Sequence, residues 1–268
     1  MKRYAYKPVF ASFCMSGFWP VVGNVIRNSD ILLLVLDARM PEISRNKELE
    51  AKIERFEKPM FRVMTKMDLL SGPEIEKLRG KYPDAFFVSG TENTGFKRLK
   101  TGIMIEGKRM GLKTVRVGVV GYPNMGKSAI INCLAKGART KVSNVAGTTR
   151  GTQWVRVGDL RIIDSPGVIP FSDRDERKLG LLVAKNPEKL RNPEETAKEI
   201  LSFLLDKSPE GVKKYFKVTL ESNNPHELFE AIMKQRHYFL KGGVLDEHRA
   251  ALDIIREWQN GKLNIKTY

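Results

Sequence analysis

One eight-residue segment constrains the fold more strongly than any other part of the sequence. Residues 121–128 read G-Y-P-N-M-G-K-S, which fits the pattern G-x-x-x-x-G-K-[S/T] of a phosphate-binding loop, or P-loop. The apolar run 115–120 before it predicts a buried parallel strand, and residues 127–136 predict a helix. Backbone N–H groups and the N-terminus of that helix then form a concave, electropositive site for phosphate oxygens. The sequence therefore predicts an α/β domain with a nucleotide site.

Different side chains of the loop are expected to contact the phosphates and the metal ion. Lys127 can reach the β- and γ-phosphates of a nucleotide, and the Ser128 hydroxyl can ligate Mg²⁺. We expect Met125, Gly126 and Ala129 to contact the nucleotide through the loop and the first turn of the helix. The alternative, a glycine-rich turn that fits the pattern by accident, does not explain the strand before the loop and the helix after it.

Composition limits the class of partner. The chain has 268 residues, a formal net charge of +16 and a pI near 9.8. Such an excess of cations favours a polyanion such as nucleic acid, although charge alone fits a generically basic protein equally well. The start of the chain lacks an apolar signal core, and the run 31–36 is too short to span a bilayer. With only 2 cysteines, the sequence predicts a cytoplasmic protein that does not use a membrane.

Strands and loops before the P-loop carry further polar residues. The apolar run 31–36 predicts a strand covered on both faces, and the loop D-A-R-M-P begins at its end with Asp37. Asp37 and Arg39 are candidates either for function or for a simple ion pair within the loop. Other expected elements are strands at 59–64 and 85–88 and helices within 10–27, at 45–57, 73–82 and 94–110.

The strand at 59–64 runs into Thr65-Lys66-Met67-Asp68, which resembles the guanine-reading N-K-x-D motif of GTPases with Thr in place of Asn. The Asp68 carboxylate can accept hydrogen bonds from N1–H and N2–H₂ of guanine, a pair that adenine does not offer. The Lys66 stem can cover the base, whereas Thr65 lacks the amide of Asn and its contact with the N7 side is open. Ser89 and Gly90 resemble the small-residue turn whose backbone N–H meets guanine O6.

Two motifs follow the P-loop. The segment G-T-T-R within 141–150 resembles switch I of GTPases, and its Thr149, or else Thr148, would complete the Mg²⁺ shell. Residues 152–157 and 160–163 flank Gly158-Asp159 and predict a hairpin. The second strand ends in D-S-P-G, which resembles switch II: Asp164 would hold a water on Mg²⁺, and the N–H of Gly167 would reach the γ-phosphate.

The order of these motifs is rotated, because the base-reading motifs precede the P-loop instead of following switch II. The chain therefore resembles the circularly permuted GTPases, most closely the YlqF/RbgA-like ribosome-biogenesis family. The D-A-R-x-P loop at 37–41 strengthens this resemblance. The resemblance implies a GTPase domain at 1–175, with a mostly parallel sheet and helices on both faces. It implies a smaller, all-α RNA-binding domain at 176–268, for which helices are expected at 174–182, 196–205, 211–220, 226–239 and 245–259.

Catalysis is expected to depart from that of Ras-like enzymes. Val168 follows Gly167 and cannot orient an attacking water as Gln does in Ras, so intrinsic turnover is expected to be slow. Lys127, Thr149 and Gly167 are the expected catalytic residues. Asn124 occupies the place of a potassium-coordinating Asn in related GTPases. Two roles remain open for it, a K⁺ ligand beside the β- and γ-phosphates or a residue that only shapes the loop.

The leading hypothesis is a Mg²⁺-dependent hydrolase of GTP to GDP and phosphate. The resemblance implies a switch in assembly of the large ribosomal subunit that binds the subunit precursor and its rRNA and is a monomer elsewhere. One alternative is an RNA-binding scaffold with a structural nucleotide and negligible hydrolysis. Two others are an ATP-using P-loop enzyme, suggested by Thr65, and a GTPase that binds membrane surfaces through its aromatic N-terminal stretch.

Overall fold

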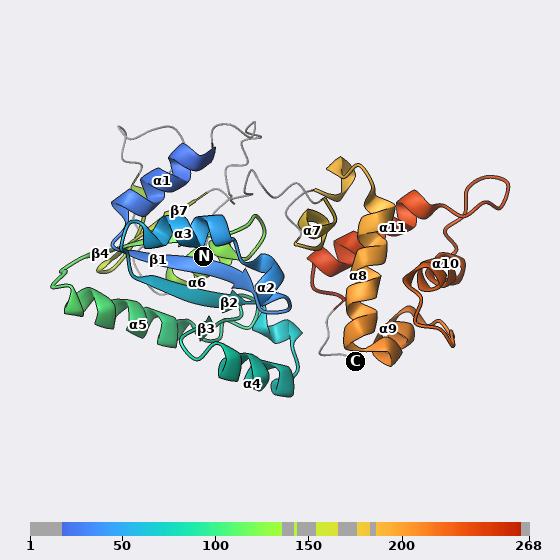
Figure 1. Ribbon diagram of the computed structural model, residues 1–268, viewed down its shortest axis with the longest axis horizontal. Helices are drawn as coiled ribbons and strands as arrows, with labels where there is room; N and C mark the ends of the chain where they lie inside the picture. The colour runs from blue at the N-terminus through green and yellow to red at the C-terminus, as the bar shows by residue number, and fades with distance from the viewer. Residues whose placement is uncertain (1–17, 136–141, 144–153, 166–175, 183–185, 264–268) are drawn as a thin grey trace, which may run out of the picture. The chain divides into compact units, whose positions relative to one another are not determined.

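The chain forms two compact units (Figure 1). The computed structural model describes residues 18–135, 142–143, 154–165, 176–182 and 186–263 of the 268. The first unit comprises Met1–Asp68 and Ile75–Ser172, and the second comprises Leu69–Glu74 and Asp173–Tyr268.

A seven-stranded sheet with the order β3-β2-β1-β4-β7-β6-β5 forms the centre of the first unit. The five strands from β3 to β7 in this order run parallel, and β6 is antiparallel to both of its neighbours. The strands are β1 (Ile31–Asp37), β2 (Met60–Thr65), β3 (Phe86–Phe87), β4 (Val115–Val120), β5 (Val142–Ser143), β6 (Trp154–Val157) and β7 (Leu160–Asp164). This arrangement confirms the expected mostly parallel sheet and the hairpin after the P-loop.

Helices cover both faces of this sheet, as the apolar strands require. All seven residues of β1 are buried. In Figure 1, α1 and α3 lie over one face and α5 over the other, and α5 and α6 contact each other as well as the sheet. The helices of this part of the chain are α1 (Phe18–Asn28), α2 (Pro41–Ser44), α3 (Lys47–Glu54), α4 (Gly72–Lys81), α5 (Phe96–Arg109) and α6 (Lys127–Ala135), with a 3₁₀ turn at Met67–Leu69.

The N-terminal aromatic stretch is described from residue 18 onward, as helix α1. Val22, Val25 and Ile26 of this helix are fully buried, and α1 packs on β4. This part of the stretch therefore belongs to the core of the first unit. No helix within the described ranges is long and apolar enough to cross a bilayer.

The described residues 186–263 are helical apart from short turns and one isolated bridge between Phe239 and Leu245. Proline at the first turn fixes the starts of α8, α9 and α10 after Asn192, Ser208 and Asn224. The helix start expected at 192–195 from its Asn-Pro-Glu-Glu sequence is confirmed by α8, whereas α10 ends before His237, whose φ is +55°. The elements are α7 (Glu176–Leu181), a 3₁₀ turn at Pro187–Lys189, α8 (Pro193–Lys207), α9 (Pro209–Phe216), α10 (Pro225–Gln235) and α11 (Glu247–Gln259).

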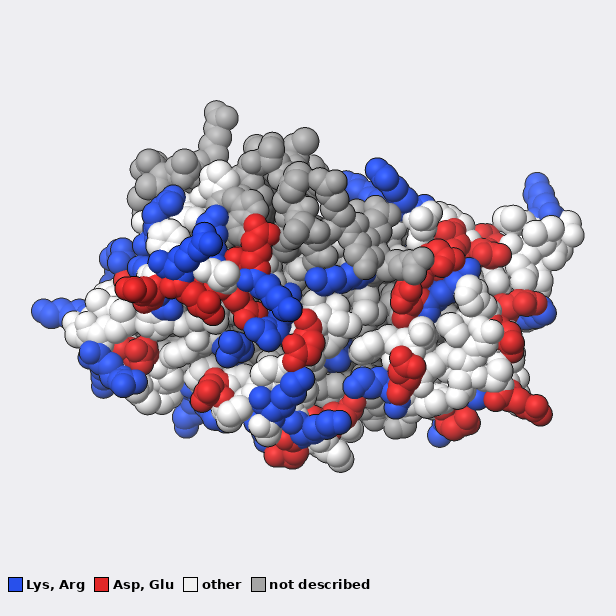
Figure 2. Space-filling view, in the orientation of Figure 1, with Lys and Arg blue, Asp and Glu red and all other residues white. Residues whose placement is uncertain are grey.

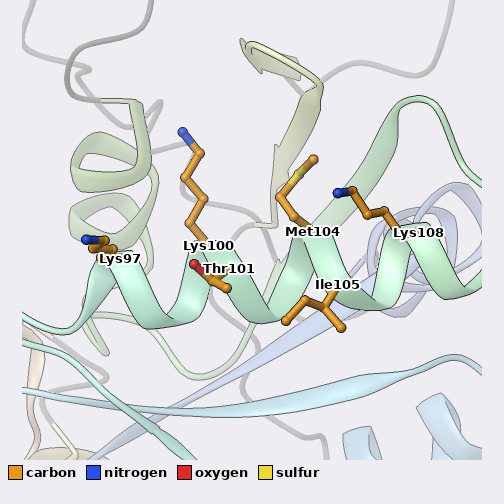
Figure 3. A pocket seen from close by; sticks show the side chains of 6 residues that line it. All are labelled: Lys97, Lys100, Thr101, Met104, Ile105 and Lys108. Atoms are coloured by element: carbon orange, nitrogen blue, oxygen red, sulfur yellow. The ribbon is translucent and has the colours of Figure 1, made fainter.

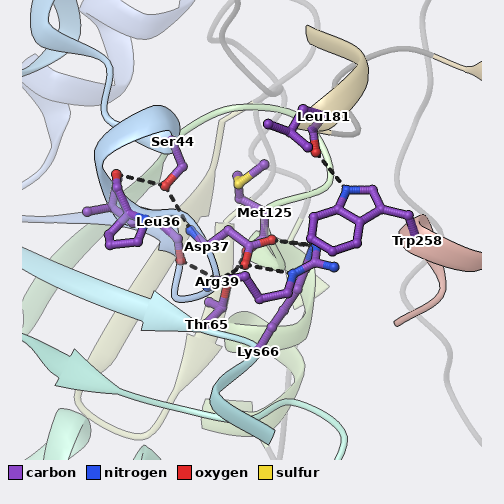
Figure 4. A network of polar contacts seen from close by, with 10 residues as sticks. Leu36, Asp37, Arg39, Ser44, Thr65, Lys66, Met125, Leu181 and Trp258 are labelled. Atoms are coloured by element: carbon purple, nitrogen blue, oxygen red, sulfur yellow. Dashed lines mark hydrogen bonds and ion pairs between the residues drawn. The ribbon is translucent and has the colours of Figure 1, made fainter. Parts of the chain in front are cut away.

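Trp258 is the largest fully buried side chain described in the second unit. Its ring meets Phe203 of α8 edge-on at a centroid distance of 5.7 Å. Its indole N–H donates to the carbonyl of Leu181 at 2.8 Å, so α11 is fixed to both α7 and α8 (Figure 4). A buried aromatic ring with a satisfied polar atom contributes both area burial and specificity to a helical core.

We predict that Trp258→Ala lowers the free energy of unfolding of the second unit by about 3–5 kcal/mol, because it removes a large buried ring and its hydrogen bond. Urea unfolding followed by far-UV circular dichroism measures the change. Leu240→Ala is the matched control, since Leu240 is 53% exposed, and it should change the stability by less than about 0.5 kcal/mol. Equal effects of both substitutions would contradict the assigned core.

Candidate nucleotide-binding site

The strand order reverses between β1 and β4, and this reversal defines the edge of the sheet where a ligand is expected. From β1 the chain continues outward to β2 and β3, whereas β4 and β7 lie on the other side of β1. In open α/β sheets, ligands bind beyond the carboxyl ends of the strands at such a reversal. The P-loop follows β4 and the D-A-R-M-P loop follows β1, so both predicted loops start at this edge.

The geometry of the P-loop suits phosphate groups. A Cβ on Gly121 would lie 2.6 Å from the carbonyl oxygen of Val35, so only glycine allows the loop to leave β4 this close to β1. Asn124 and Gly126 have positive φ values of +58° and +88°, and α6 begins directly afterwards at Lys127. The predicted strand, loop and helix are thus present, and they fit the nest of backbone N–H groups that phosphates require.

Lys127 is held inside this loop. Its ammonium group donates to the carbonyl of Tyr122 at 2.6 Å and to that of Gly121 at 3.2 Å, and the residue is only 7% exposed. Ser128 follows it in the first turn of α6. A buried cation and a hydroxyl at the start of a helix form a donor set that suits a nucleotide phosphate with its Mg²⁺.

Thr65 joins the P-loop to the ends of two strands. In the register of β1 and β2, Thr65 lies opposite Asp37. Its hydroxyl donates to the carbonyl of Met125 at 2.7 Å and to that of Leu36 at 3.0 Å (Figure 4). One hydroxyl proton is shared by these two acceptors. The structure therefore directs the hydroxyl of Thr65 toward protein carbonyls, whereas the sequence left its contact with the N7 side of the base open.

A buried ion cluster lies next to Thr65. The Asp37 carboxylate, which is fully buried, meets the Arg39 guanidinium at 2.9 Å and the Lys66 ammonium at 2.8 Å. Burial alone would raise the pKa of Asp37, but the two cations outweigh it and hold that pKa well below its usual range. The ion pair considered for Asp37 and Arg39 is present, and it extends to Lys66.

The contact with Lys66 could not be found by pattern because Lys66 belongs to a different motif, 29 positions from Asp37. The register of β1 and β2 places Thr65 opposite Asp37, and Lys66, which follows Thr65, therefore lies close to Asp37. The backbone of Lys66 itself has a positive φ of +60°, which directs the chain from β2 into the 3₁₀ turn that contains Asp68.

The turn at Ser89 and Gly90 lies against the start of α6. A Cβ on Gly90 would come within 2.9 Å of the Ala129 Cβ, and the Cys133 thiol lies 3.8 Å from the Gly90 carbonyl. The Ser89 hydroxyl accepts a hydrogen bond from the N–H of Glu92 at 3.0 Å and so shapes the turn. The structure thus places this predicted turn beside the P-loop helix.

The predicted switch residues are described only in part. Thr148, Thr149 and Gly167 lie outside the described residues, and of Asp164 only the backbone is described, at the end of β7 opposite Val119. The next residue, Ser165, was not predicted to matter. Its hydroxyl and its N–H both donate to the Val119 carbonyl, at 2.7 and 3.2 Å, and fix the start of the D-S-P-G segment against β4.

Comparison with known proteins agrees with this geometry. Residues 116–233 match the family model described as 50S ribosome-binding GTPase. An uncharacterized GTP-binding protein of Methanocaldococcus jannaschii is 41% identical over 246 residues, which are 91% of this chain and 65% of that protein. Ribosome biogenesis GTPase A of Bacillus cereus is 27% identical, over 89% of this chain and 86% of that protein.

Among solved structures, GNP-bound YlqF from T. maritima has the same fold, with a TM-score of 0.59 at 20% identity over 92% of this chain and 95% of that one. The chain spans 55–65% of the length of three of the curated relatives that it matches, the M. jannaschii protein among them. The resemblance read from the motif order is confirmed, and so is the fold class. In its matched GTPase region, its relatives and its fold, the chain is similar to the circularly permuted GTPases of the YlqF/RbgA-like family.

Proposed function

We propose that this protein binds GTP with Mg²⁺, hydrolyses it to GDP and phosphate, and acts as a switch in assembly of the large ribosomal subunit. The observation that carries the nucleotide part is the hydrogen bond from Thr65 to Met125, which joins the base-reading motif to the P-loop at one edge of the sheet. The ribosomal part is supported by the relatives named ribosome biogenesis GTPase A and by the net charge of +16.

Guanine is read by groups on the loops after β2 and β3. Asp68 accepts two hydrogen bonds from the guanine edge, and the backbone of Ser89 and Gly90 meets O6. The stem of Lys66 runs from the strand end to an ammonium group fixed on Asp37. Asp37 therefore acts as a positioning residue, because it holds the Lys66 stem along the site without touching the base itself.

Phosphates are held by the P-loop backbone and by Lys127. Ser128 and Thr149 would ligate Mg²⁺ directly and Asp164 would do so through a water, while the N–H of Gly167 would meet the γ-phosphate. Mg²⁺, when bound, neutralises the charge that gathers on the oxygens between the β- and γ-phosphates. Val168 lacks a polar group for the attacking water, so turnover is slow until the ribosomal particle is bound.

The second unit reports the state of the nucleotide and carries RNA-binding residues. Only residues 165–172 separate the end of β7 from the start of the second stretch of this unit at Asp173. A rearrangement of switch II on hydrolysis is thus transmitted to the helical unit through a short connection. Exposed cations of α9 and of the turns after α9 and α10, among them Lys214, Lys217 and Lys241, offer contacts for rRNA phosphates.

The alternatives differ in measurable ways. A scaffold with a structural nucleotide binds GTP but shows no multiple turnover with ribosomal particles. An ATP-using enzyme shows competition of ATP against GTP. A membrane-surface GTPase floats with liposomes. The hydrogen bonds of Thr65 to backbone carbonyls give this residue a role that needs no change of base, so they support GTP over ATP.

We predict that Asp68→Asn weakens GDP binding by roughly 100-fold or more, since two hydrogen bonds to a charged acceptor contribute about 1.5–3 kcal/mol each. Xanthosine diphosphate should bind this variant better, because an amide can donate to the extra carbonyl of xanthine. Thr65→Val is the matched control from the same motif. This substitution deprives two carbonyls of their hydrogen-bond donor and should lower the free energy of unfolding by about 1–3 kcal/mol. It should leave the preference for guanine unchanged.

Displacement of a fluorescent GDP analogue by GDP, ADP and xanthosine diphosphate measures both affinity and selectivity for these two variants. A loss of guanine preference in Thr65→Val would show that Thr65 reads the base. An unchanged preference in Asp68→Asn would remove Asp68 from the base-reading role.

We predict that Asp37→Asn lowers the free energy of unfolding by about 3–5 kcal/mol at pH 7, because two buried cations lose their partner. The pKa of Asp37 is lowered in the folded protein, so its contribution is complete above the unfolded pKa near 4 and is lost at more acidic pH. The stability difference between the wild type and the variant should therefore shrink below about pH 4.

Urea titrations between pH 3 and pH 7 test this dependence. Glu106→Gln is the control, because Glu106 pairs with Arg109 at 3.2 Å on the surface of α5, where a pair contributes less than about 1 kcal/mol. A difference for Asp37→Asn that stays constant across this pH range would mean that the ion cluster is not the source of the stability.

The proposed function as a whole is tested by GTP hydrolysis in K⁺ and in Na⁺, with and without large ribosomal subunits. We expect stimulation by the subunits that is larger in K⁺. Asn124→Gly separates the two roles left open for this residue, because glycine keeps the positive φ of +58° while the side chain is lost. The variant should bind GDP normally but lose the difference between K⁺ and Na⁺.

Tight GTP binding without stimulation under any condition would instead favour the scaffold. If Asn124→Gly retains the full K⁺ effect, Asn124 only shapes the loop.

A further inference from the structure

The charge of +16 is not spread as one uniform surface. On the face that Figure 2 shows, blue Lys and Arg side chains alternate with red Asp and Glu side chains. Helix α4 illustrates this pattern, because its Arg79 pairs with Glu76 at 2.7 Å and its Lys81 pairs with Glu42 at 2.7 Å. A surface meant for a polyanion should differ by having cations without acidic partners.

The outer face of α5 differs in this way. Lys97, Lys100 and Lys108 are exposed, and none of them forms an ion pair with any part of the chain that the structure describes. They span about 16 Å along the helix. Figure 3 shows Lys100 and Lys108 leaving α5 on the same side as Met104, whereas Ile105 leaves it on the other. The single acidic residue of the helix, Glu106, is engaged by Arg109 at 3.2 Å.

A groove runs along α5 at the edge of the sheet. Its volume is about 940 Å³, and Lys97, Thr101 and Ile105 line it together with aromatic residues of β2 and β3. Phe61 and Phe86 contact each other at a centroid distance of 5.3 Å, and the Phe86 ring fills the space where a Cβ on Gly102 would come within 2.6 Å. Ile105 is 55% exposed beside it. The groove thus combines half-buried rings and an aliphatic wall with the cations Lys97 and Arg98, and one carboxylate, Asp84, also lines it.

This combination matches the chemistry of an unpaired nucleotide strand. Single-stranded RNA presents a row of phosphates and bases whose faces stack on aromatic side chains, and proteins bind it with a cationic track beside such rings. The Arg98 guanidinium already lies 6.0 Å from the centroid of the Phe86 ring, where it adds a planar cation to the same site. Duplex RNA offers the phosphates but not the free bases that would use the groove.

We propose that the outer face of α5, with the groove at Phe61, Phe86 and Ile105, is a binding surface for single-stranded RNA. Lys97, Lys100 and Lys108 contact phosphates, and a base enters the groove. The proposal rests on the proposed function, because a ribosomal particle supplies the RNA. It adds an RNA contact on the GTPase domain to the RNA contacts expected of the helical unit.

The test uses the full chain with GDP and a fluorescein-labelled 12-nucleotide oligouridine, followed by fluorescence anisotropy at several KCl concentrations. The triple variant Lys97→Ala, Lys100→Ala, Lys108→Ala should bind at least about tenfold more weakly at 0.1 M salt. The slope of log affinity against log salt should fall by about 2, since each phosphate contact of a single strand contributes about 0.7.

The matched control is Lys47→Ala, Arg55→Ala, Lys77→Ala, which removes three exposed cations from the same unit. This control should change the affinity for oligouridine and its salt dependence little. An equal loss of affinity in the two triple variants would overturn the proposal, because it would mean that the RNA responds only to the net charge of the protein. Ile105→Ala tests the groove and should weaken single-stranded RNA more than a hairpin duplex. Equal weakening of both RNAs, or none, would exclude a base in the groove.

Photocrosslinking gives a readout that does not depend on affinity. Oligouridine with 4-thiouridine should crosslink within residues 96–110 or at Phe61 or Phe86, and crosslinks that fall only elsewhere would overturn the proposal even if the second unit dominates RNA binding. Binding of a fluorescent GDP analogue is measured on every variant and should equal that of the wild type. A wild type that crosslinks through α5 but binds no guanine nucleotide would refute the proposed function and leave this surface intact.

Discussion

The hydroxyl of Thr65 holds together two loops that are sixty residues apart in the chain. Its hydrogen bonds to Met125 and Leu36 join the end of β2, the end of β1 and the P-loop, so the geometry of the phosphate site depends on the register of the sheet. A GTPase with Asn at this position can use the amide for similar contacts and keep a donor for the base. Thr has one hydroxyl, and here the protein backbone uses its proton. Under the proposed function, guanine selectivity would then depend on Asp68 and on the turn at Gly90.

The ion cluster at Asp37 is a second constraint on the same edge. One buried carboxylate compensates two cations, and such a group is stable only when good geometry offsets the loss of hydration. The Asp37 carboxylate also accepts a hydrogen bond from the backbone N–H of Arg39 at 3.0 Å. The backbone N–H of Asp37 donates to the Ser44 hydroxyl at 3.1 Å. Apolar residues of similar size could fill this space, but they would not hold the Lys66 ammonium at a fixed point. The cluster therefore gives specificity to a loop that packing alone would leave free to vary.

Patterns that depend on neighbouring residues predicted most of this fold. The apolar run of β1 and the P-loop with its strand and helix follow from local sequence, and so does the hairpin of β6 and β7. Contacts of Thr65, Ser165 and Lys66 did not follow, because each depends on which distant strand lies beside it. The predicted strand 85–88 proved to be two residues long, since only Phe86 and Phe87 pair with β2. Local sequence gives the elements, whereas their register decides which polar atoms meet.

Rotation of the chain explains why α5 is available as a surface. Because the P-loop strand comes after the base-reading strands, the chain must return from the edge strand β3 to the central strand β4, and α5 is that connection. Leu99, Ile103 and Gly107 repeat at helical spacing and are buried, which satisfies the packing requirement of the crossover. On its other face, Arg98 and Gly102 meet the Phe86 ring, whereas Lys97, Lys100 and Lys108 are exposed and form no ion pair with the described residues. The short β3 protects the sheet edge from further strand pairing. It also leaves the rings of Phe61 and Phe86 half-exposed beside the cations of α5, and this juxtaposition arises directly from the order of the strands.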